Sequence, residues 1–96
     1  MKKIKICYVG PISDLVGIQS EEIVIEENKT IMQLIEEVVN RRPLLKKIIK
    51  MELLDDPENS PVMIAVNNRL LLARQDFMRI LNDGDVVILS YPLVGG

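Results

Sequence analysis

Two glycines, Gly95 and Gly96, stand at the end of the sequence, directly after a predicted strand and a short tail. Glycine makes up about 7% of average proteins, so a terminal pair arises by chance in about half a percent of chains. Because glycine lacks a Cβ atom, it adopts almost any φ/ψ and can thread a narrow channel. A carboxylate on such a tail can reach bound ATP and be activated as an acyl-adenylate. The alternative interpretation is a frayed terminus of small residues.

Few other residues suggest chemistry. The sequence has no histidine, which removes the commonest general base and the commonest metal ligand. The one cysteine, Cys7, lies in a predicted strand, where a small apolar filler is the simpler interpretation. Asp55 and Asp56 lie in a loop over residues 52–61 that offers no further ligands at a suitable spacing. We therefore predict no metal site and no tightly bound cofactor.

Composition bounds the class of protein. Ninety-six residues, 48% of them hydrophobic, predict a single domain over residues 1–96 with an aliphatic core, because the chain has one Phe, two Tyr and no Trp. A net charge of −2 argues against nucleic acid as a partner, and no apolar run approaches the roughly 20 residues of a membrane span. A single cysteine excludes an intrachain disulfide and fits the reducing cytoplasm, which is the expected location.

The first quarter of the chain predicts two strands. Residues 3–9 and residues 21–27 alternate between apolar and polar side chains, as half-buried strands do. Gly10 and the proline after it end the first strand, and residues 12–16 leave room for one helical turn. The short connection favours antiparallel pairing. The side chains expected to face the core are Ile4, Ile6, Tyr8, Ile23 and Ile25.

A helix is predicted over residues 31–42. Thr30 and Gln33 have the spacing of a capping box, in which each side chain bonds the other residue's backbone N–H. Apolar residues then recur at helical spacing along one face, and Pro43 ends the helix. Because proline is tolerated in a first turn, a second short helix is expected over residues 44–51. The apolar face is formed by Ile31, Leu34, Ile35, Val38 and Val39.

The remaining chain predicts three more strands. Residues 62–66 and 69–72 form a hairpin around Asn67 and Asn68, because Asn tolerates positive φ. A turn over residues 82–85 leads into a last strand over 86–91, which is apolar on both faces. Val87, Leu89 and Tyr91 are expected to face the helix. Val86 and Ile88 would then form an exposed apolar face, which usually marks an interface. Met51 and Met78 are interpreted as core fillers.

At this point the residues resemble a family, the MoaD and ThiS sulfur carriers. The resemblance covers nearly the whole chain in order, and its specific parts are the Asp-Gly-Asp turn and the terminal diglycine. The matching segments are Ile4–Tyr8 with Leu15–Gly17, Thr30–Ile35, Val66–Asn68, Leu81–Val87 and Pro92–Gly96. The resemblance implies an α+β, ubiquitin-like β-grasp roll, in which a mixed sheet of about four to five strands is covered by the main helix.

The resemblance also implies a function. In these carriers the terminal glycine, here Gly96, is adenylated by an activating enzyme and converted to a thiocarboxylate, while Gly95 lets the tail thread the partner. In the MoaD branch, which this chain resembles most, the sulfur is donated to a pterin inside the large subunit of molybdopterin synthase. The chain would then be no enzyme alone, and ATP would belong to the activating enzyme. Partner-binding residues are expected in the last strand and a flexible tail over 92–96: Val86, Ile88, Ser90, Tyr91, Pro92, Leu93 and Val94.

Alternatives remain open at this level. The same tail chemistry serves tRNA thiolation, thiazole synthesis and attachment to protein lysines, and the sequence does not choose among these acceptors and the pterin. A different class is a β-grasp module that only binds, with an incidental Gly-Gly end. The presence or absence of sulfur at the terminus of the cellular protein separates the two classes.

Overall fold

A computed structural model describes residues 1–49 and 62–91. The predicted loop 52–61, Met51 and the tail 92–96 lie outside the described residues. The described elements, in chain order, are β1 (Lys2–Val9), α1 (Pro11–Val16), β2 (Ser20–Ile25), α2 (Ile31–Arg41), η1 (Pro43–Lys47), β3 (Met63–Val66), β4 (Arg69–Leu70), η4 (Arg74–Met78) and β5 (Val86–Ser90).

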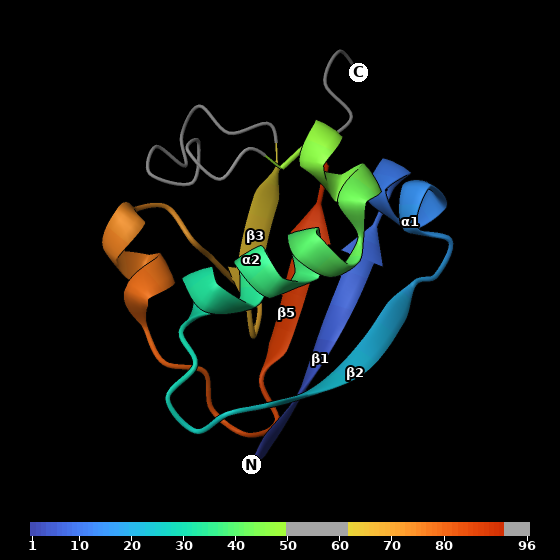
Figure 1. The fold of residues 1–96 in the computed structure, drawn as a ribbon. Coiled ribbons are helices and arrows are strands. Elements are labelled where there is room, and N and C mark those ends of the chain that lie inside the picture. The colour runs from blue at the N-terminus through green and yellow to red at the C-terminus, as the bar shows by residue number, and fades with distance from the viewer. Residues whose placement is uncertain (50–61, 92–96) are drawn as a thin grey trace.

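The strands form one mixed sheet in the order β2-β1-β5-β3-β4. Strand β5 returns to the centre, where it lies parallel to β1 and antiparallel to β3. Helix α2 crosses one face of this sheet (Figure 1). This arrangement is the predicted β-grasp roll. It places the last strand, which leads into the diglycine tail, between two neighbours that hold it from both sides.

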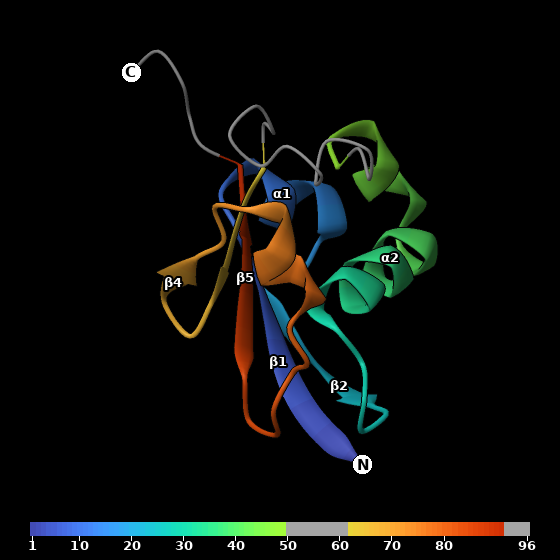
Figure 2. The same ribbon diagram turned by 90° about the vertical axis from the view of Figure 1, so that its left-hand side faces the viewer.

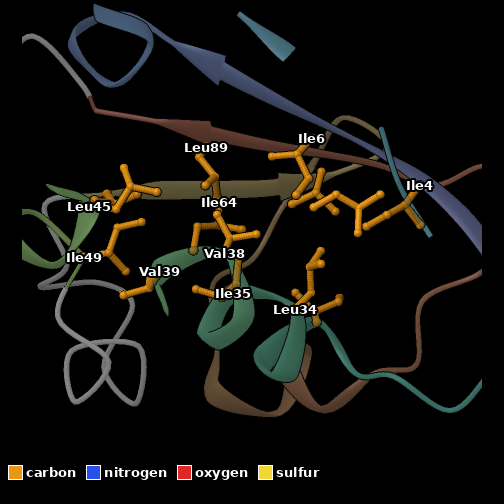
Figure 3. Packing of buried hydrophobic residues seen from close by; sticks show 14 of the residues in the cluster. Ile4, Ile6, Leu34, Ile35, Val38, Val39, Leu45, Ile49, Ile64 and Leu89 are labelled. Carbon is orange, nitrogen blue, oxygen red and sulfur yellow. The ribbon is translucent and has the colours of Figure 1, made fainter. Parts of the chain in front are cut away.

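The core lies between the sheet and α2. Side chains from β1, β3 and β5 point toward those from the helix in Figure 3. The strand register aligns buried residues across the sheet, with Tyr8 opposite Leu89 and Ile64 on the other side of Leu89. The predicted contributors from both layers are all buried: Ile4, Ile6, Ile23, Ile25, Leu34, Ile35, Val38, Val39, Val87 and Leu89.

The predicted capping box at the start of α2 is confirmed. The backbone N–H of Gln33 donates to Thr30 Oγ1 at 3.1 Å, and the Thr30 N–H donates to Gln33 Oε1 at 2.9 Å. Both bonds satisfy N–H groups that a helix N-terminus leaves without intrahelical partners. At the other end the Arg42 N–H donates to the carbonyl of Val38, and Pro43 follows.

The two predicted turns are tied together by side chains. Asn67 and Asn68 have φ of 52° and 67°, as the hairpin requires. The Asn67 amide donates to Asp85 Oδ1 at 2.8 Å, and its oxygen accepts from the Val86 N–H at 2.9 Å. Asp85 also accepts from the Asn82 N–H at 2.8 Å. These bonds attach the β3–β4 hairpin to the residue where β5 begins.

Several local predictions were wrong in type or extent. The segment predicted as a helix over 44–51 is a 3₁₀ helix over Pro43–Lys47, stabilised by i→i+3 bonds such as that from Leu45 N–H to the Arg42 carbonyl. Strand β2 ends at Ile25, before a turn in which the Lys29 N–H donates to the Glu26 carbonyl. The returning strand, predicted over 69–72, is only Arg69–Leu70, and β5 ends one residue before Tyr91.

The segment before the last turn also differs from the prediction. Met78 is exposed, so its interpretation as a core filler was wrong. It belongs to η4, a 3₁₀ helix that periodicity did not predict. Phe77, the neighbouring residue, is the side chain that enters the core. One turn of 3₁₀ helix is too short to show a period, so the sequence pattern could not tell which of the two faces inward.

Candidate functional site

The sheet has one face that the helices leave uncovered. Figure 2 shows α1 and α2 on one side of the sheet, with no described helix on the other. Strand β5 alternates between these sides: Val87 and Leu89 are fully buried, whereas Val86, Ile88 and Ser90 are only half-buried. The predicted register of the last strand is therefore confirmed, and Val86 and Ile88 lie on the outer face as expected.

Neighbouring strands extend this outer face into an apolar patch. Ile88 lies opposite Cys7 in β1 and Ala65 in β3, and Ala65 lies opposite Leu70 in β4. Val9 and Met63 flank Ser90 in the same way and are 45% and 42% exposed. The name outer patch is used below for Cys7, Val9, Met63, Ala65, Leu70, Val86 and Ile88. Exposed apolar areas of this kind are typical of docking surfaces.

Charged residues border the outer patch at the end where β5 begins. Lys5 lies beside Val86 and opposite Glu22 of β2. Lys3 Nζ lies 3.6 Å from a Glu22 carboxylate oxygen, and both side chains are largely exposed. Solvated pairs of this kind contribute little stability. The outer face therefore combines an apolar centre with charged residues at one end, and an apolar core with a polar rim is the usual anatomy of a protein interface.

The base of the tail is held at the opposite end of β5. Ser90 is paired with both Val9 and Met63, so the strand is anchored on both sides up to its last residue. Gly10, with φ of +67°, passes close by: a Cβ atom there would lie 3.6 Å from the Tyr91 carbonyl oxygen. Only glycine adopts this backbone conformation without strain. The chain thus leaves the sheet from a fixed position.

Tyr91 turns away from the outer patch. It packs against the core and, with Pro11, Leu15 and Ile48, lines an apolar hollow of about 230 Å³ beside α1 and η1. The structure therefore divides the predicted partner-binding residues: Val86, Ile88 and Ser90 share the outer face, and Tyr91 lies on the helix side. Pro92, Leu93, Val94, Gly95 and Gly96 lie outside the described residues.

Sequence reasoning did not find the other members of the outer patch. Strand alternation assigns Cys7 and Val9 to the outward side of β1, but it does not show that β5 lies next to them. That adjacency depends on a pairing between segments some 80 residues apart. Cys7, interpreted from the sequence as a small apolar filler, is a half-buried free thiol on this outer face.

A cluster of three polar side chains, Tyr8, Glu21 and Arg42, lies on the helix side of the sheet. The Tyr8 hydroxyl donates to Glu21 Oε2, and Arg42 Nε donates to the same oxygen at 3.0 Å. The Arg42 guanidinium also lies 5.8 Å from the centre of the Tyr8 ring. Burial raises the pKa of the Tyr8 phenol, and the hydrogen bond to Glu21 raises it further. The cluster joins β1, β2 and the end of α2.

Within residues 1–49 and 62–91, no helix is long and apolar enough to cross a lipid bilayer. The same ranges contain no group of three or more acidic or cysteine side chains placed to hold a metal ion.

Comparison with known proteins places the chain in a class. The model of the ThiS family matches residues 6–96, which include the whole outer patch and the diglycine. The chain belongs to the ThiS family. A comparison with curated protein sequences gave no match.

Solved structures agree with the fold. A protein from Pyrococcus furiosus described as a molybdopterin converting factor, subunit 1, is 31% identical with a TM-score of 0.79, covering 97% of this chain and 100% of that one. SAMP1 from Haloferax volcanii is 16% identical with a TM-score of 0.76, covering 98% and 99%. A complex of subunits 1 and 2 of the molybdopterin-converting factor from Helicobacter pylori contains a chain that is 20% identical, with a TM-score of 0.62 and 98% and 99% coverage.

Proposed function

We propose that this protein is a sulfur carrier whose Gly96 carboxylate is adenylated by an activating enzyme, converted to a thiocarboxylate and used as a sulfur donor in molybdopterin synthesis. The observation that carries the proposal is the diglycine that follows the central strand, after four further residues, in a ThiS-family chain. The 31% identity to the Pyrococcus furiosus subunit favours the molybdopterin branch of this chemistry.

The fold supports the proposal by holding the strand that precedes the tail within the surface that would be recognised. Strand β5 is held between β1 and β3, so a partner that grips the outer patch also sets the position from which the tail departs. Because the fold already positions the strand before the tail, docking of the outer patch would direct the C-terminal carboxylate toward an ATP site without any rearrangement of the sheet. Glycines without side chains allow this final approach.

The chemistry requires no catalytic residue from this chain. In the first step a Gly96 carboxylate oxygen attacks the α-phosphate of ATP, and pyrophosphate leaves. The acyl-adenylate is a mixed anhydride, so a sulfur nucleophile at the oxidation level of sulfide attacks the acyl carbon and displaces AMP. The product is a thiocarboxylate, which is ionised and nucleophilic at neutral pH. The absence of histidine is compatible with this scheme, because the partner enzymes supply the acid, the base and the ATP site.

Two protein partners follow from the proposal. One is the adenylating enzyme. The other is a molybdopterin synthase large subunit, and the Helicobacter pylori structure, a complex of subunits 1 and 2, supports a partner of this kind. The outer patch is the surface we assign to docking. Attachment to protein lysines is the main competing use of the same tail. The fold shared with SAMP1 is compatible with that use, but 16% identity carries an argument for the fold alone.

The test uses the intact chain, its activating enzyme, ATP and Mg²⁺. Exchange of labelled pyrophosphate into ATP should depend on this protein and should be abolished by deletion of Gly96 or by a short C-terminal extension. Gly95→Val should slow the exchange through restricted φ/ψ and added width. Urea unfolding of each variant is the control for folding. Protein from cells should show one terminal oxygen replaced by sulfur in its intact mass.

Two results would reject parts of the proposal. Exchange that proceeds equally well without Gly96 would reject the carrier function and favour a module that only binds. A protein recovered mainly as isopeptide conjugates, with no sulfur at its terminus, would favour the modifier function over sulfur donation.

A further inference from the structure

A second hollow lies away from the tail, at the opposite end of β5. It has a volume of about 220 Å³ and is formed where the β3–β4 hairpin, the first residue of α2 and the turn before β5 meet. Its polar lining includes Arg69, Arg79, Asn67, Asn82 and Asp85. Asp85 directly precedes β5, whereas Tyr91 directly follows it. The hollow, called the arginine pocket below, is therefore separate from the base of the tail.

Among the residues that the structure describes, the two arginines of this pocket have no acidic partner. In the part of the chain that the structure describes, neither the Arg69 nor the Arg79 side chain forms an ion pair or a hydrogen bond. Arg42, by contrast, is paired with Glu21 at 2.9 Å. Each free guanidinium offers several N–H donors in a planar fork that matches the oxygens of a carboxylate or a phosphate.

The one acidic residue in the pocket is already engaged. Asp85 is buried, and its two carboxylate oxygens accept from the Asn67 side chain and from the Asn82 N–H, each at 2.8 Å. Both Asp85 oxygens are therefore hydrogen-bonded within the hairpin and the turn, and Asp85 does not pair with either arginine. The Asp85 carboxylate offsets one of the two guanidinium charges, so the pocket keeps a net positive charge. The first residue of α2, Ile31, adds the positive end of a helix dipole.

Both arginines have exposed side chains, and the fold fixes the backbone segments that carry them. Arg69 is paired with Val66 across the hairpin. The Arg79 carbonyl accepts from the Ile31 N–H at 3.0 Å, and Ile80 forms a bridge with Thr30. The arginines therefore project from two fixed segments on either side of the hollow. Because these segments do not have to be ordered on binding, part of the entropic cost of binding is already met by the fold.

An apolar wall completes the pocket. Leu71 and Val66 contribute to the lining, and Ile80 is 49% exposed at its edge. An exposed isoleucine next to two unpaired guanidiniums suits a ligand with a charged group at one end and an apolar or ring portion beside it. A bare inorganic ion would use the arginines but not this wall.

We propose that the arginine pocket binds an oxyanion group, a phosphate or a carboxylate, carried by a small molecule whose body lies against Ile80. This inference does not depend on the sulfur-carrier function, since it involves neither the tail nor the outer patch.

The test is a titration of the full chain at constant ionic strength, followed by amide chemical shifts in NMR spectra. The probes are inorganic phosphate, AMP and succinate. We expect saturable shifts at Asn67, Ile80 and Asn82, with AMP binding more tightly than inorganic phosphate. Arg69→Gln and Arg79→Gln should each weaken binding about tenfold, because each removes a charge-assisted hydrogen-bonding group.

Arg41→Gln is the matched control. It removes the same charge from the last turn of α2, at the far end from Ile31, and should leave the affinity unchanged. Deletion of Gly96 should also leave it unchanged, which keeps failure of this inference distinct from failure of the proposed function. Saturation by succinate alone would assign the site to carboxylates, and saturation by phosphate and AMP would assign it to phosphates.

Three outcomes would overturn the inference. The chemical shifts would fail to saturate with any probe, or Arg69→Gln and Arg79→Gln would leave the affinity unchanged. Alternatively, Arg41→Gln would lower the affinity as much as the pocket variants do, which would indicate a nonspecific charge effect. Equal affinity for AMP and inorganic phosphate would remove Ile80 from the site. Urea midpoints equal to that of the wild type would show that the variants are folded.

Discussion

Leu89 and Ile88 are adjacent in β5 but should respond very differently to replacement by alanine. Leu89 is fully buried between Tyr8 and Ile64, whereas Ile88 is half-buried on the outer patch. We expect Leu89→Ala to lower the free energy of unfolding by about 3–4 kcal/mol and Ile88→Ala by about 1 kcal/mol. The pair thus tests which face of β5 belongs to the core.

The magnitudes follow from burial. Leu89→Ala removes three buried carbons, worth about 2.4 kcal/mol at roughly 0.8 kcal/mol each. The surrounding core is closed by α2 and cannot fully collapse, so a cavity term brings the total to about 3–4 kcal/mol. Ile88 is already partly in contact with water, so its truncation loses only part of the transfer term. On an open face no closed cavity remains.

Equilibrium unfolding in urea measures both values. With a slope of about 1.5 kcal/mol/M, Leu89→Ala should lower the midpoint by roughly 2–3 M and Ile88→Ala by roughly 0.7 M. Similar losses for the two variants would show that the outer face is covered in the free protein, and would refute its assignment as a docking surface. A larger loss for Ile88→Ala would mean that the strand register is wrong by one residue.

The same variants separate stability from docking. Under the proposed function, Ile88→Ala should raise the protein concentration at which the activating enzyme is half-saturated, while leaving the protein folded. Leu89→Ala, assayed under conditions where it remains folded, should leave that concentration near the wild-type value, because its side chain does not reach the outer patch.

Two further predictions concern the structure around the helix. Thr30→Ala should cost about 1 kcal/mol by removing the N-cap, whereas Thr30→Ser keeps the hydroxyl and should cost much less; equal losses in urea unfolding would contradict the role of the cap. The pKa of the Tyr8 phenol is raised in the folded state. Below about pH 10, the pKa of an unfolded tyrosine, the phenol keeps its proton in the folded and the unfolded state alike. As the pH rises above about 10, only the unfolded state loses the proton, so the free energy of unfolding falls by at most about 1.4 kcal/mol per pH unit. Urea unfolding between pH 9 and 11 should show this added alkaline loss in the wild type and not in Tyr8→Phe.

Local patterns carried most of the fold prediction. Period-two alternation placed Ile4, Ile6 and Tyr8 on the buried face, and the Thr30–Gln33 pair located the start of α2 to the residue. Both signals arise from interactions within a few residues, so they can be read without knowing the rest of the fold. The capped helix and the alternating strands were therefore predicted well. The short 3₁₀ segments η1 and η4 were not, because one turn has no period to detect.

The candidate site was predicted only in part for a related reason. The diglycine and the apolar residues on both faces of β5 can be recognised in the amino-acid sequence, so Val86 and Ile88 could be predicted as surface residues of the site. Val9, Met63 and Leu70 could not, because their place on the same face as Ile88 depends on how β1, β3 and β4 are arranged around β5.

The sequence by itself determined the chemistry that this chain can offer and the local elements that carry it. The Gly-Gly pair at positions 95 and 96, the capped helix and the alternating strands are properties of neighbouring residues, set by side-chain type and backbone preference. Tertiary structure alone decided which of these surfaces meet. Insertion of β5 between β1 and β3 turned scattered outward residues into one apolar patch, and closure of the hairpin against the start of α2 brought Arg69 and Arg79 to the same hollow. The physical reason is that these contacts are fixed by the packing of a shared core, which no single segment of the chain encodes.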